Sequence, residues 1–514
     1  MTPRKPLLPF AVIIVASLIG HRSSAAEPAP PRPNIVFLLT DDLGYGDLGC
    51  YGQTKIRTPN LDRLAAEGMR FTQHYAGSNV CAPSRCVLMS GLHPGHAYIR
   101  ENRGLPDHEG QEPVPPGALQ FPLTLKRLGY TVGGFGKWGL GSVQSTGSPL
   151  EQGFDRFFGY NCQWKAHNYY PTYLWDNDRK FPLNNPNIAA HQKLPPGVDP
   201  NLPANYAPYF GRVYSADVIA QKAREFVEAN RDKPFWLYFP TTVPHLGLEV
   251  PEDSLREYEG KFPEKPYEGG RGYLPQRTPR AAYAAMITRM DREIGRIVQL
   301  VKRLGLEERT IFVFTSDNGP PAIESGGFPV GFFNSAGGLR GGKADFYEGG
   351  FRVPCIVRWK GRIAAGATSA RVTGFEDWFP TLLELIGEKA ATPKKLDGIS
   401  FAPTLLGKQQ PPRPFLYREM FSCACVRVGD WKLVWPNLRK GPFRGNGQRP
   451  PTAELYDLAK DPAEATNVAA DHPQTVAKLE QVERQQHVKS ELFPLPALDG
   501  ATVDRHPKKS RKSN

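Results

Sequence analysis

One cysteine stands in a pattern that could build an anion-binding site. Cys81 lies two residues before Pro83 and four before Arg85. Because proline fixes its own backbone and disfavours helix at the residue before it, we expect Cys81 to lie at a turn. The apolar residues 87–89 predict the first turns of a buried helix, whose N-terminus would attract an anion beside Arg85. An isolated Cys-x-Pro would indicate only a structural cysteine near a turn.

Acidic and amide side chains follow two separate apolar runs, residues 34–39 and 310–315. Both runs are short and continuous, which predicts buried parallel strands. The polar residues after them are Asp41, Asp42, Asp317 and Asn318. Ligands bind at the carboxyl ends of strands in open α/β sheets, and adjacent carboxylates repel unless water or a cation separates their charges. Three carboxylates and an amide suit Ca²⁺ or Mg²⁺ rather than zinc, and an irregular loop-built site favours Ca²⁺.

Three basic residues lie where further strands should end or beside mobile glycines. Lys137 follows the run at residues 130–135, and His245 follows the run at 234–239. Lys343 comes directly after a Gly-rich segment, which suits a lid over a site. Each could be an ordinary surface residue by itself. Several strand ends that carry charged side chains together indicate one site.

These residues need a sheet to bring them together, and the chain predicts one. Apolar strands alternate with amphipathic helices, among them residues 215–229 and 280–304, which is typical of an α/β fold. From about residue 396 short β-type runs appear, followed by a helix near 473–486. We therefore expect a large mixed, mostly parallel sheet flanked by helices, and a smaller C-terminal antiparallel-sheet subdomain.

The N-terminus has the pattern of a signal peptide over residues 1–26. Arg4 and Lys5 precede a short apolar core, and small residues 24–26 form a cleavage site. The core is too short for a comfortable membrane span, and no other apolar run reaches that length. We expect an exported protein without membrane insertion, periplasmic or secreted. The predicted domains are a catalytic domain at 27–395, a C-terminal subdomain at 396–490 and a basic, disordered tail at 491–514.

Composition excludes some classes of protein. The 514 residues carry a formal net charge of +13, but no nucleic-acid-binding motif accompanies it, so a polyanionic substrate is the natural partner. Seven cysteines scattered through so long a chain do not form a small disulfide scaffold. Residues 154–175 are unusually aromatic and include His167; core packing is the simpler interpretation, and a platform for sugar rings is the alternative.

Taken together, these motifs resemble those of the type I sulfatases, of the alkaline phosphatase-like α/β fold. The full pattern is Cys-x-Pro-Ser-Arg followed by Ser90-Gly91, and the resemblance extends from residue 33 to about 468. It implies that a maturation enzyme oxidises Cys81 to formylglycine. One hydroxyl of the hydrated aldehyde then attacks sulfur, and the other later expels the sulfate.

The resemblance also implies a role for each matched residue. The calcium ligands match Asp41, Asp42, Asp317 and Asn318, with the modified Cys81 completing the site. Arg85 matches the arginine that orients the diol and the metal carboxylates. Lys137 matches a lysine that contacts formylglycine and sulfate. His245 and Lys343 match the pair that binds sulfate and assists the leaving oxygen.

One position departs from the family. Gly139 stands in Gly-Lys-Trp-Gly-Leu-Gly, where the family usually has a histidine that deprotonates the diol. We expect open space there and another histidine as the base, because the pKa of histidine lies near working pH. His167 is the candidate and His96 the second choice; the alternative is that His167 only packs or binds sugar.

The function that this resemblance implies is sulfuric ester hydrolysis with formylglycine and Ca²⁺. Export, positive charge and the aromatic segment favour a sulfated saccharide as the substrate. Two alternatives remain: a phosphodiester or phosphonate hydrolase of the same superfamily, and a calcium-holding sulfoglycan binder that has lost turnover.

Overall fold

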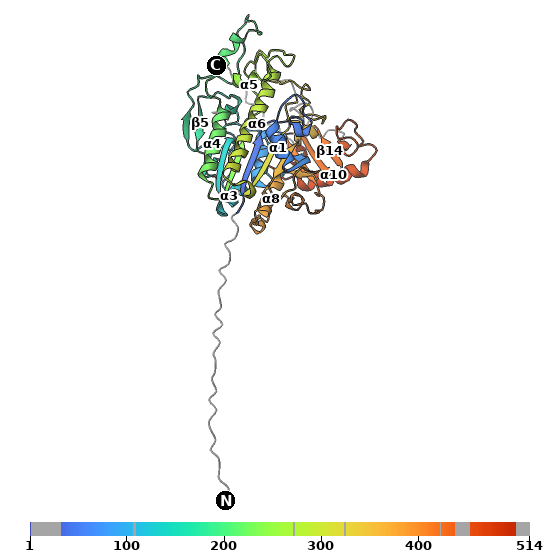
Figure 1. Cartoon of the computed structure of the whole chain (residues 1–514). Coiled ribbons are helices and arrows are strands. Elements are labelled where there is room, and N and C mark those ends of the chain that lie inside the picture. The colour runs from blue at the N-terminus through green and yellow to red at the C-terminus, as the bar shows by residue number, and fades with distance from the viewer. Residues whose placement is uncertain are drawn as a thin grey trace. The chain divides into compact units, whose positions relative to one another are not determined.

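The computed structural model describes Met1 and residues 32–105, 109–270, 273–322, 325–421, 423–436 and 453–499 (Figure 1). The chain divides into Met1–Arg32 and Pro33–Asn514, and all the architecture below belongs to the second unit. Residues 2–26 of the predicted signal peptide and residues 500–514 lie outside the described residues. Within the described ranges, no helix combines the length and the apolar character needed to cross a membrane.

A mixed 11-stranded sheet lies at the centre of the described chain, in the order β10-β2-β9-β8-β1-β7-β3-β4-β5-β6 with β11 beside β2. Its strands are β1 (Asn34–Thr40), β2 (Met69–Tyr75), β3 (Thr131–Lys137), β4 (Arg156–Tyr160), β5 (Tyr173–Asp176), β6 (Arg179–Pro182), β7 (Phe235–Pro240), β8 (Thr310–Ser316), β9 (Arg352–Arg358), β10 (Ala367–Ser369) and β11 (Thr373–Gly374). β8, β1, β7, β3 and β4 run parallel, whereas β9 is antiparallel to both neighbours. The predicted mixed, mostly parallel sheet is confirmed.

Helices cover both faces of this sheet, which explains why the strands are apolar along their whole length. Val36 and Leu38 pack in one layer, and their β1 neighbours Ile35, Phe37 and Leu39 pack in the other. The first layer contains α1 (Pro59–Ala66), α4 (Ser215–Ala229) and α6 (Pro279–Arg303), with α6 between the other two (Figure 1). The second contains α2 (Cys81–Ser90), α3 (Gln120–Arg127) and α8 (Trp378–Leu385). The short helices are α5 (Glu252–Leu255), α7 (Glu348–Phe351) and α9 (Ala402–Leu405).

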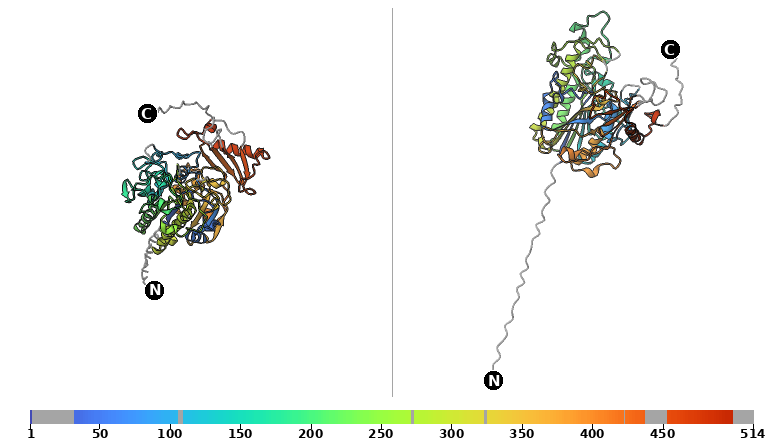
Figure 2. Two further views of the ribbon diagram at one scale, coloured as in Figure 1. Left: turned by 90° about the horizontal axis from the view of Figure 1, so that it is seen from above. Right: turned by 90° about the vertical axis from the view of Figure 1, so that its right-hand side faces the viewer.

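A second, antiparallel sheet follows in the C-terminal region and contains four strands in the described residues (Figure 2, orange to red). They are β12 (Leu416–Met420), β13 (Cys423–Val428), β14 (Trp431–Trp435) and β15 (Glu454–Asp457). Helix α10 (Pro473–Gln486) packs on β13 and β14 and buries Leu479 against them. The predicted small antiparallel sheet covered by a helix is confirmed.

A buried ion cluster joins the small sheet to the segment that precedes β9. The Lys432 ammonium on β14 lies 3.1 Å from a Glu348 carboxylate oxygen and 2.9 Å from one of Glu464. All three side chains are almost fully buried. The Glu348 backbone N–H also donates to the Glu464 carboxylate over 2.6 Å. Because breaking a buried ion pair leaves an uncompensated charge, this cluster ties the two sheets together.

Two local predictions are corrected. Cys81 is not in a turn but is the first residue of α2, with Val80 extended before it. Pro83 is tolerated because the first N–H groups of a helix have no intrahelical partner. The prediction of disorder is also wrong for residues 491–499, since Phe493 and Leu495 are buried and Pro496–Asp499 forms α11.

Candidate active site

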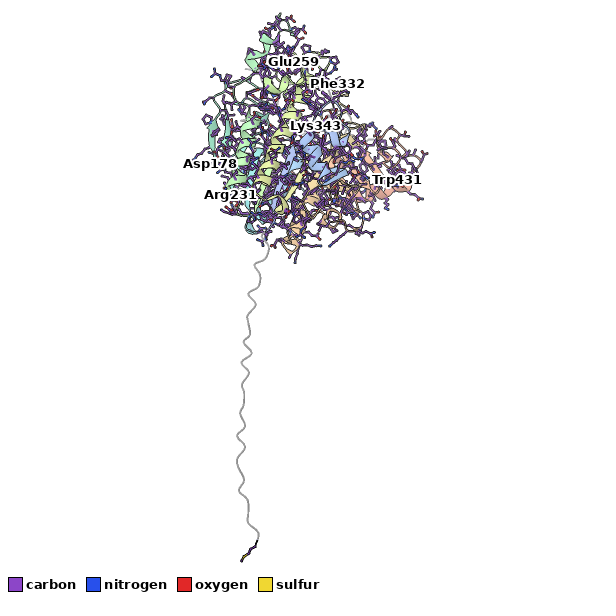
Figure 3. All side chains as sticks on the ribbon, in the orientation of Figure 1. Asp178, Arg231, Glu259, Phe332, Lys343 and Trp431 are labelled. Carbon is purple, nitrogen blue, oxygen red and sulfur yellow. The ribbon has the colours of Figure 1, made fainter. Side chains whose placement is uncertain are left out.

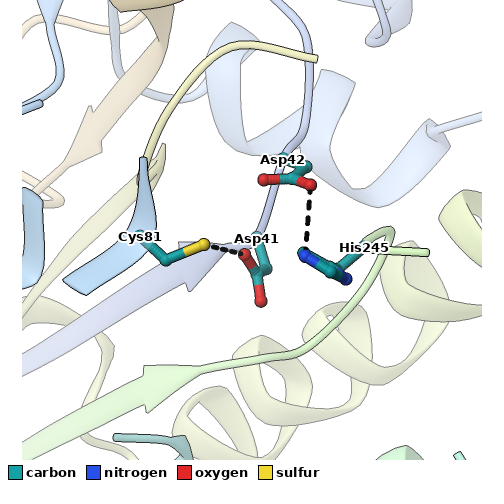
Figure 4. Close-up of side chains that lie close together, drawn as sticks. All are labelled: Asp41, Asp42, Cys81 and His245. Atoms are coloured by element: carbon teal, nitrogen blue, oxygen red, sulfur yellow. Dashed lines mark hydrogen bonds and ion pairs between the residues drawn. The ribbon is translucent and has the colours of Figure 1, made fainter. Parts of the chain in front are cut away.

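Parallel pairing brings four strand ends to one edge of the main sheet. β1 lies between β8 and β7, and β7 pairs in turn with β3. Thr40 at the end of β1 stands opposite Ser316 at the end of β8, so the acidic residues after each strand become neighbours. Lys137 ends β3, and His245 follows β7 by five residues. The residues predicted from separate strand ends therefore meet in one place (Figure 4).

Three carboxylates and one amide converge there, all fully buried. The Asp42 backbone N–H donates to Asp317 Oδ1 over 3.2 Å, and Asn318 Nδ2 donates to Asp42 Oδ1 over 2.7 Å. Asn318 Oδ1 is buried without a hydrogen-bond partner. Burial and the nearby Asp41 charge raise the pKa of Asp317 to about 7, against the pull of Arg85. An orphaned amide oxygen beside crowded carboxylates fits a hard divalent cation.

Cys81 lies against this cluster at the start of α2. Its sulfur is 3.3 Å from Asp41 Oδ1 (Figure 4), 3.3 Å from the Lys137 ammonium and 3.6 Å from that of Lys343. Burial, followed by the Asp41 charge, raises the pKa of the Cys81 thiol to about 12. A nucleophilic cysteine needs a lowered pKa, so this position does not suit thiolate chemistry.

Arg85, one helical turn after Cys81, reaches under the carboxylates. Its Nε and Nη2 donate to the same Asp317 oxygen over 3.1 and 2.8 Å, and its Nη1 donates to the Lys137 carbonyl. The guanidinium is 1 % exposed, which makes the pair charge-assisted and shielded from water. Arg85 therefore fixes both a carboxylate and the end of β3.

Two ammonium groups flank the sulfur from different segments. Lys137 Nζ lies 2.7 Å from Asp41 Oδ2, and Lys343 Nζ lies 2.8 Å from Asp42 Oδ2. Burial alone would favour neutral Asp41, but the Lys137 ammonium and the Arg85 guanidinium hold the pKa of that carboxyl well below its usual range. Lys343 keeps 20 % of its side chain exposed, so it also faces the cavity beside the cluster.

The segment around Lys343 is anchored on both sides. Arg340 donates to the Tyr456 hydroxyl over 2.9 Å and to the Glu464 carbonyl over 2.8 Å, both in the C-terminal region. On the other side, the Ala344 N–H donates to the carbonyl of Asn79, two residues before Cys81, over 2.9 Å. The C-terminal subdomain and the Cys81 segment thus hold Lys343 between them.

His245 approaches the carboxylates from the opposite side to Cys81 (Figure 4). Its Nε2 lies 3.5 Å from Asp42 Oδ2, and its Nδ1 contacts the Leu246 carbonyl. That contact makes Nδ1 the protonated nitrogen and turns Nε2 toward the cluster. Burial and the Lys343 charge lower the pKa of His245 well below its ordinary value, so the imidazole is neutral here.

A cavity of about 510 Å³ opens over these residues. Its wall includes Cys81, Lys137, His167, Gln163, His245 and Lys343. His167 stacks on His245 with ring centroids 4.9 Å apart and planes 12° apart, so the aromatic segment does fold back over the cavity. Burial, together with the charges of Lys137 and Lys343, lowers the pKa of His167 well below its ordinary value. The geometry brings together every predicted catalytic residue, including His167.

The open space expected at Gly139 is absent. A Cβ built on Gly139 would lie 2.9 Å from both Cγ and Cδ of Gln163, so the glutamine occupies that volume. Gln163 is 6 % exposed, and its Oε1 has no hydrogen-bond partner. Gly139 also has a φ of +87°, which favours glycine over any residue with a side chain. Gln163 therefore fills the volume that a side chain at position 139 would need.

The second-choice base is placed elsewhere. His96 Nδ1 lies 2.9 Å from Asp397 Oδ1, and its ring stacks on His93 with centroids 4.3 Å apart. Neither histidine lines the cavity over Cys81. The prediction that His96 could serve beside Cys81 is therefore wrong, because the loop after α2 turns it toward the C-terminal half of the chain.

The residues of the aromatic segment divide between the core and the cavity wall. Phe157, Phe158 and Tyr169 are at most 1 % exposed and belong to the core. Trp164, by contrast, is 45 % exposed and lines the cavity. Gln163 and Tyr273 are among the wall residues that sequence reasoning missed. An amide inside an aromatic run gave no signal, and Tyr273 lies in a loop without a pattern.

Comparison with known proteins identifies relatives along most of the chain. A family model described as Sulfatase matches residues 33–388, and one described as N-sulphoglucosamine sulphohydrolase, C-terminal, matches residues 342–491. The N-acetylgalactosamine-6-sulfatase of Mus musculus is 32 % identical over 83 % of this chain and 76 % of its own length. The N-acetylgalactosamine-6-O-sulfatase of Bacteroides thetaiotaomicron is 30 % identical over 88 % of this chain and 92 % of its own length.

The fold has close counterparts among solved structures. One, from work on glycosaminoglycan metabolism by Bacteroides thetaiotaomicron, superposes with a TM-score of 0.68. It is 28 % identical in sequence and covers 88 % of this chain and 98 % of its own. The large sheet and the C-terminal subdomain are therefore shared over nearly the whole of that protein.

The packing of Gln163 against Gly139 gives a first prediction. Gly129 has nearly the same φ, +84°, but open space around it, so Gly129→Ala is a matched control. Gly129→Ala should lower the free energy of unfolding by about 1–2 kcal/mol, the cost of left-handed backbone. Gly139→Ala should cost about 1–3 kcal/mol more, because its Cβ overpacks against Gln163. Equal losses in denaturant unfolding would show that Gln163 does not fill this volume.

Proposed function

Because the chain belongs to the sulfatase family, as a type I sulfatase of the alkaline phosphatase superfamily, we propose that it releases sulfate from a sulfated saccharide with a formylglycine made from Cys81 and a bound Ca²⁺. The observation that carries the proposal is the convergence of two lysines on the Cys81 sulfur, at 3.3 and 3.6 Å, beside three buried carboxylates. This arrangement offers cationic groups to an anion at a position where the thiol itself is inert.

The charge distribution supports binding of a sulfate ester. A monoanionic sulfate group would meet the ammonium groups of Lys137 and Lys343, both supplied by anchored segments. Fixed donors aimed at developing negative charge are usually the largest contribution to such catalysis. The two lysines now pair with Asp41 and Asp42, and a divalent cation among the carboxylates would release them toward the substrate.

Four side chains would hold the metal: Asp41, Asp42, Asp317 and Asn318. Their carboxylate and amide oxygens, including the orphaned Oδ1 of Asn318, form a hard donor set. When bound, Ca²⁺ offsets the carboxylate charges and polarises an oxygen of the sulfate group. Arg85 keeps Asp317 in position through its paired donors.

The modified Cys81 would supply a hydroxyl nucleophile that no encoded side chain provides. Asp41, 3.3 Å from the present sulfur, and Lys137, 3.3 Å from it, can fix the orientation of the group. Asp41 follows β1 and Lys137 ends β3, two strands of the main sheet. The nucleophile is therefore held by rigid elements. Rigid support of this kind is what nucleophilic catalysis needs.

Proton transfer is assigned to the two stacked histidines. His245, with Nε2 turned toward the cluster, is placed to serve the leaving oxygen of the substrate. A bound anion between the lysines favours the protonated imidazole and so opposes the lowering of its pKa. His167, neutral and stacked on His245, is the base in place of the side chain missing at Gly139.

A saccharide is the proposed substrate class for two reasons. Relatives at 30–32 % identity are named for a sulfated sugar, N-acetylgalactosamine 6-sulfate. The cavity itself has an exposed tryptophan, Trp164, next to cationic side chains. An aromatic face for an apolar sugar face, beside lysines for the sulfate, suits such a substrate. We further propose that the protein is exported and matured by a formylglycine-generating enzyme.

The second prediction concerns Cys81. The wild type should hydrolyse p-nitrophenyl sulfate, and at least one of a panel of defined sulfated monosaccharides, much faster than p-nitrophenyl phosphate. A peptide that contains residue 81 should carry an aldehyde, seen by mass and by hydrazide labelling. Cys81→Ala should fold and lose more than about 1000-fold in kcat. Cys86→Ala, a buried cysteine on the same helix, is the control and should keep the aldehyde.

An unmodified thiol in fully active enzyme would end the formylglycine proposal. Faster hydrolysis of the phosphate ester would instead assign the site to the phosphoester branch of the superfamily. Binding of sulfated sugars without any turnover by fully modified protein would favour the sulfoglycan-binding alternative.

The third prediction concerns calcium. Exhaustive chelation should abolish turnover and lower the midpoint of thermal unfolding, because a ligand that binds only the folded state stabilises it. Added Ca²⁺ should restore both better than Mg²⁺. Asp317→Asn should lose the bound ion, measured by elemental analysis. Asp397→Asn, which changes the carboxylate beside His93 and His96, should retain it. Full activity in metal-free protein would refute the site.

The fourth prediction concerns His167. If it is the base, His167→Ala should slow the release of sulfate more than the release of the alcohol. A burst of alcohol followed by a slower steady rate should then appear, with kcat reduced by about 100-fold or more. His96→Ala is the control, because that ring contacts His93 and Asp397 and does not line the cavity. A raised KM with unchanged kcat and no burst would make His167 a binding residue.

A further inference from the structure

A second cavity adjoins the one over Cys81. It has a volume of about 360 Å³, within the range of small-molecule sites. Cys162 and Trp164 line both cavities, so a chain of linked rings could extend from one into the other. The remaining wall comes from β4, β5 and the loop near residue 188, elements that contribute nothing to the carboxylate cluster.

Partly exposed aromatic rings form much of this second wall. Trp164 is 45 % exposed, and its indole packs against His191 with ring centroids 4.4 Å apart. Tyr173 and Trp175 on β5 meet edge to face at 5.7 Å. These rings are held in place by neighbours, yet they leave surface toward the cavity. A pre-ordered aromatic surface stacks on a flat apolar face at little entropic cost.

A buried amide in the same wall has no partner. Asn161 is 0 % exposed, and both its Nδ2 and its Oδ1 lack a hydrogen bond within the described protein. Its backbone carbonyl is used, since it accepts from the Gly139 N–H over 3.2 Å. A buried amide normally has partners, because desolvation without a hydrogen bond costs about 1–3 kcal/mol per group. A donor and an acceptor side by side match hydroxyl groups, which both donate and accept.

Two lysines lie at this cavity: the Lys180 ammonium lies over the Tyr173 and Trp175 rings, 4.4 and 5.6 Å from their centroids, and Lys165 is paired with a carboxylate. Lys165 Nζ lies 3.5 Å from a Glu109 carboxylate oxygen, and the Tyr173 hydroxyl donates to Glu109 over 3.0 Å. The cationic groups that suit a sulfate group therefore lie in the first cavity, beside Cys81. The second suits an uncharged ring rich in hydroxyl groups.

We propose that this second cavity is a saccharide subsite that binds the neutral sugar linked to the sulfated one. Trp164 and Trp175 pack on the ring, and the Asn161 amide takes up its hydroxyl groups. The proposal rests on the proposed sulfatase function for the position of the sulfated ring. It makes an oligosaccharide, rather than a free sulfated monosaccharide, the better ligand.

Binding to the full chain with Cys81→Ala, measured by calorimetry, tests the subsite without turnover. The probes are N-acetylgalactosamine 6-sulfate and its two disaccharides, with a hexose linked on either side. One disaccharide should bind about tenfold more tightly than the monosaccharide. Asn161→Ala or Trp175→Leu, added to this protein, should reduce that ratio to about threefold or less. Asn161→Ala should not lower the midpoint of thermal unfolding, because it removes a side chain without partners.

The control is Trp431→Leu, an aromatic residue on β14 that should leave the ratio unchanged. Figure 3 labels Trp431 on the opposite side of the view from Asp178, which lies in the turn between β5 and β6. Equal affinities for all three probes, or an unchanged ratio in both subsite variants, would overturn the subsite. Failure of the unsubstituted enzyme to hydrolyse p-nitrophenyl sulfate would instead count against the proposed function, which separates the two outcomes.

Discussion

Repulsion among three buried carboxylates is the constraint on which the site depends. Asp41, Asp42 and Asp317 lie at the end of adjacent parallel strands, and a sheet with this order cannot keep them apart. Arg85, Lys137 and Lys343 each pair with one of them, and each comes from a different element. Charge as well as packing therefore holds three elements together at the site: α2, the end of β3 and the segment before α7.

The sequence predicted the site well where chemistry and periodicity coincide. Asp41 and Asp317 could be placed together because each follows a continuous apolar strand, and parallel strands end at one edge. The type of the large sheet followed from the same runs. Antiparallel β9, inserted between β2 and β8, could not be foreseen, because a strand buried on both faces looks alike in either direction.

The sequence did not predict residues whose roles depend on the space that their side chains fill in the folded protein. The sequence predicted open space at Gly139, because it shows that a side chain is missing but not which neighbouring residue fills the space. Gln163 stands 24 positions later and carries no motif of its own. Asn161 is similar: an asparagine among aromatic residues suggests a turn, and only its environment shows an amide without partners. A sequence pattern indicates which charged residues lie at strand ends. Which neutral side chains face a cavity depends on packing in the folded protein.

The anchoring of Lys343 has a consequence for how such proteins can be recombined. Arg340 reaches Tyr456 and Glu464, while Glu464 and Glu348 share Lys432 of the small sheet. One cation of the pocket is thus positioned through Arg340 by residues 116 and 124 positions further along the chain, across the boundary between the two sheets. In a chimera with the C-terminal region of a relative, the contacts that position Lys343 would come from a different protein. The two regions depend on each other through these buried charged residues. A functional chimera therefore requires that the charged residues of both regions come from the same parent protein.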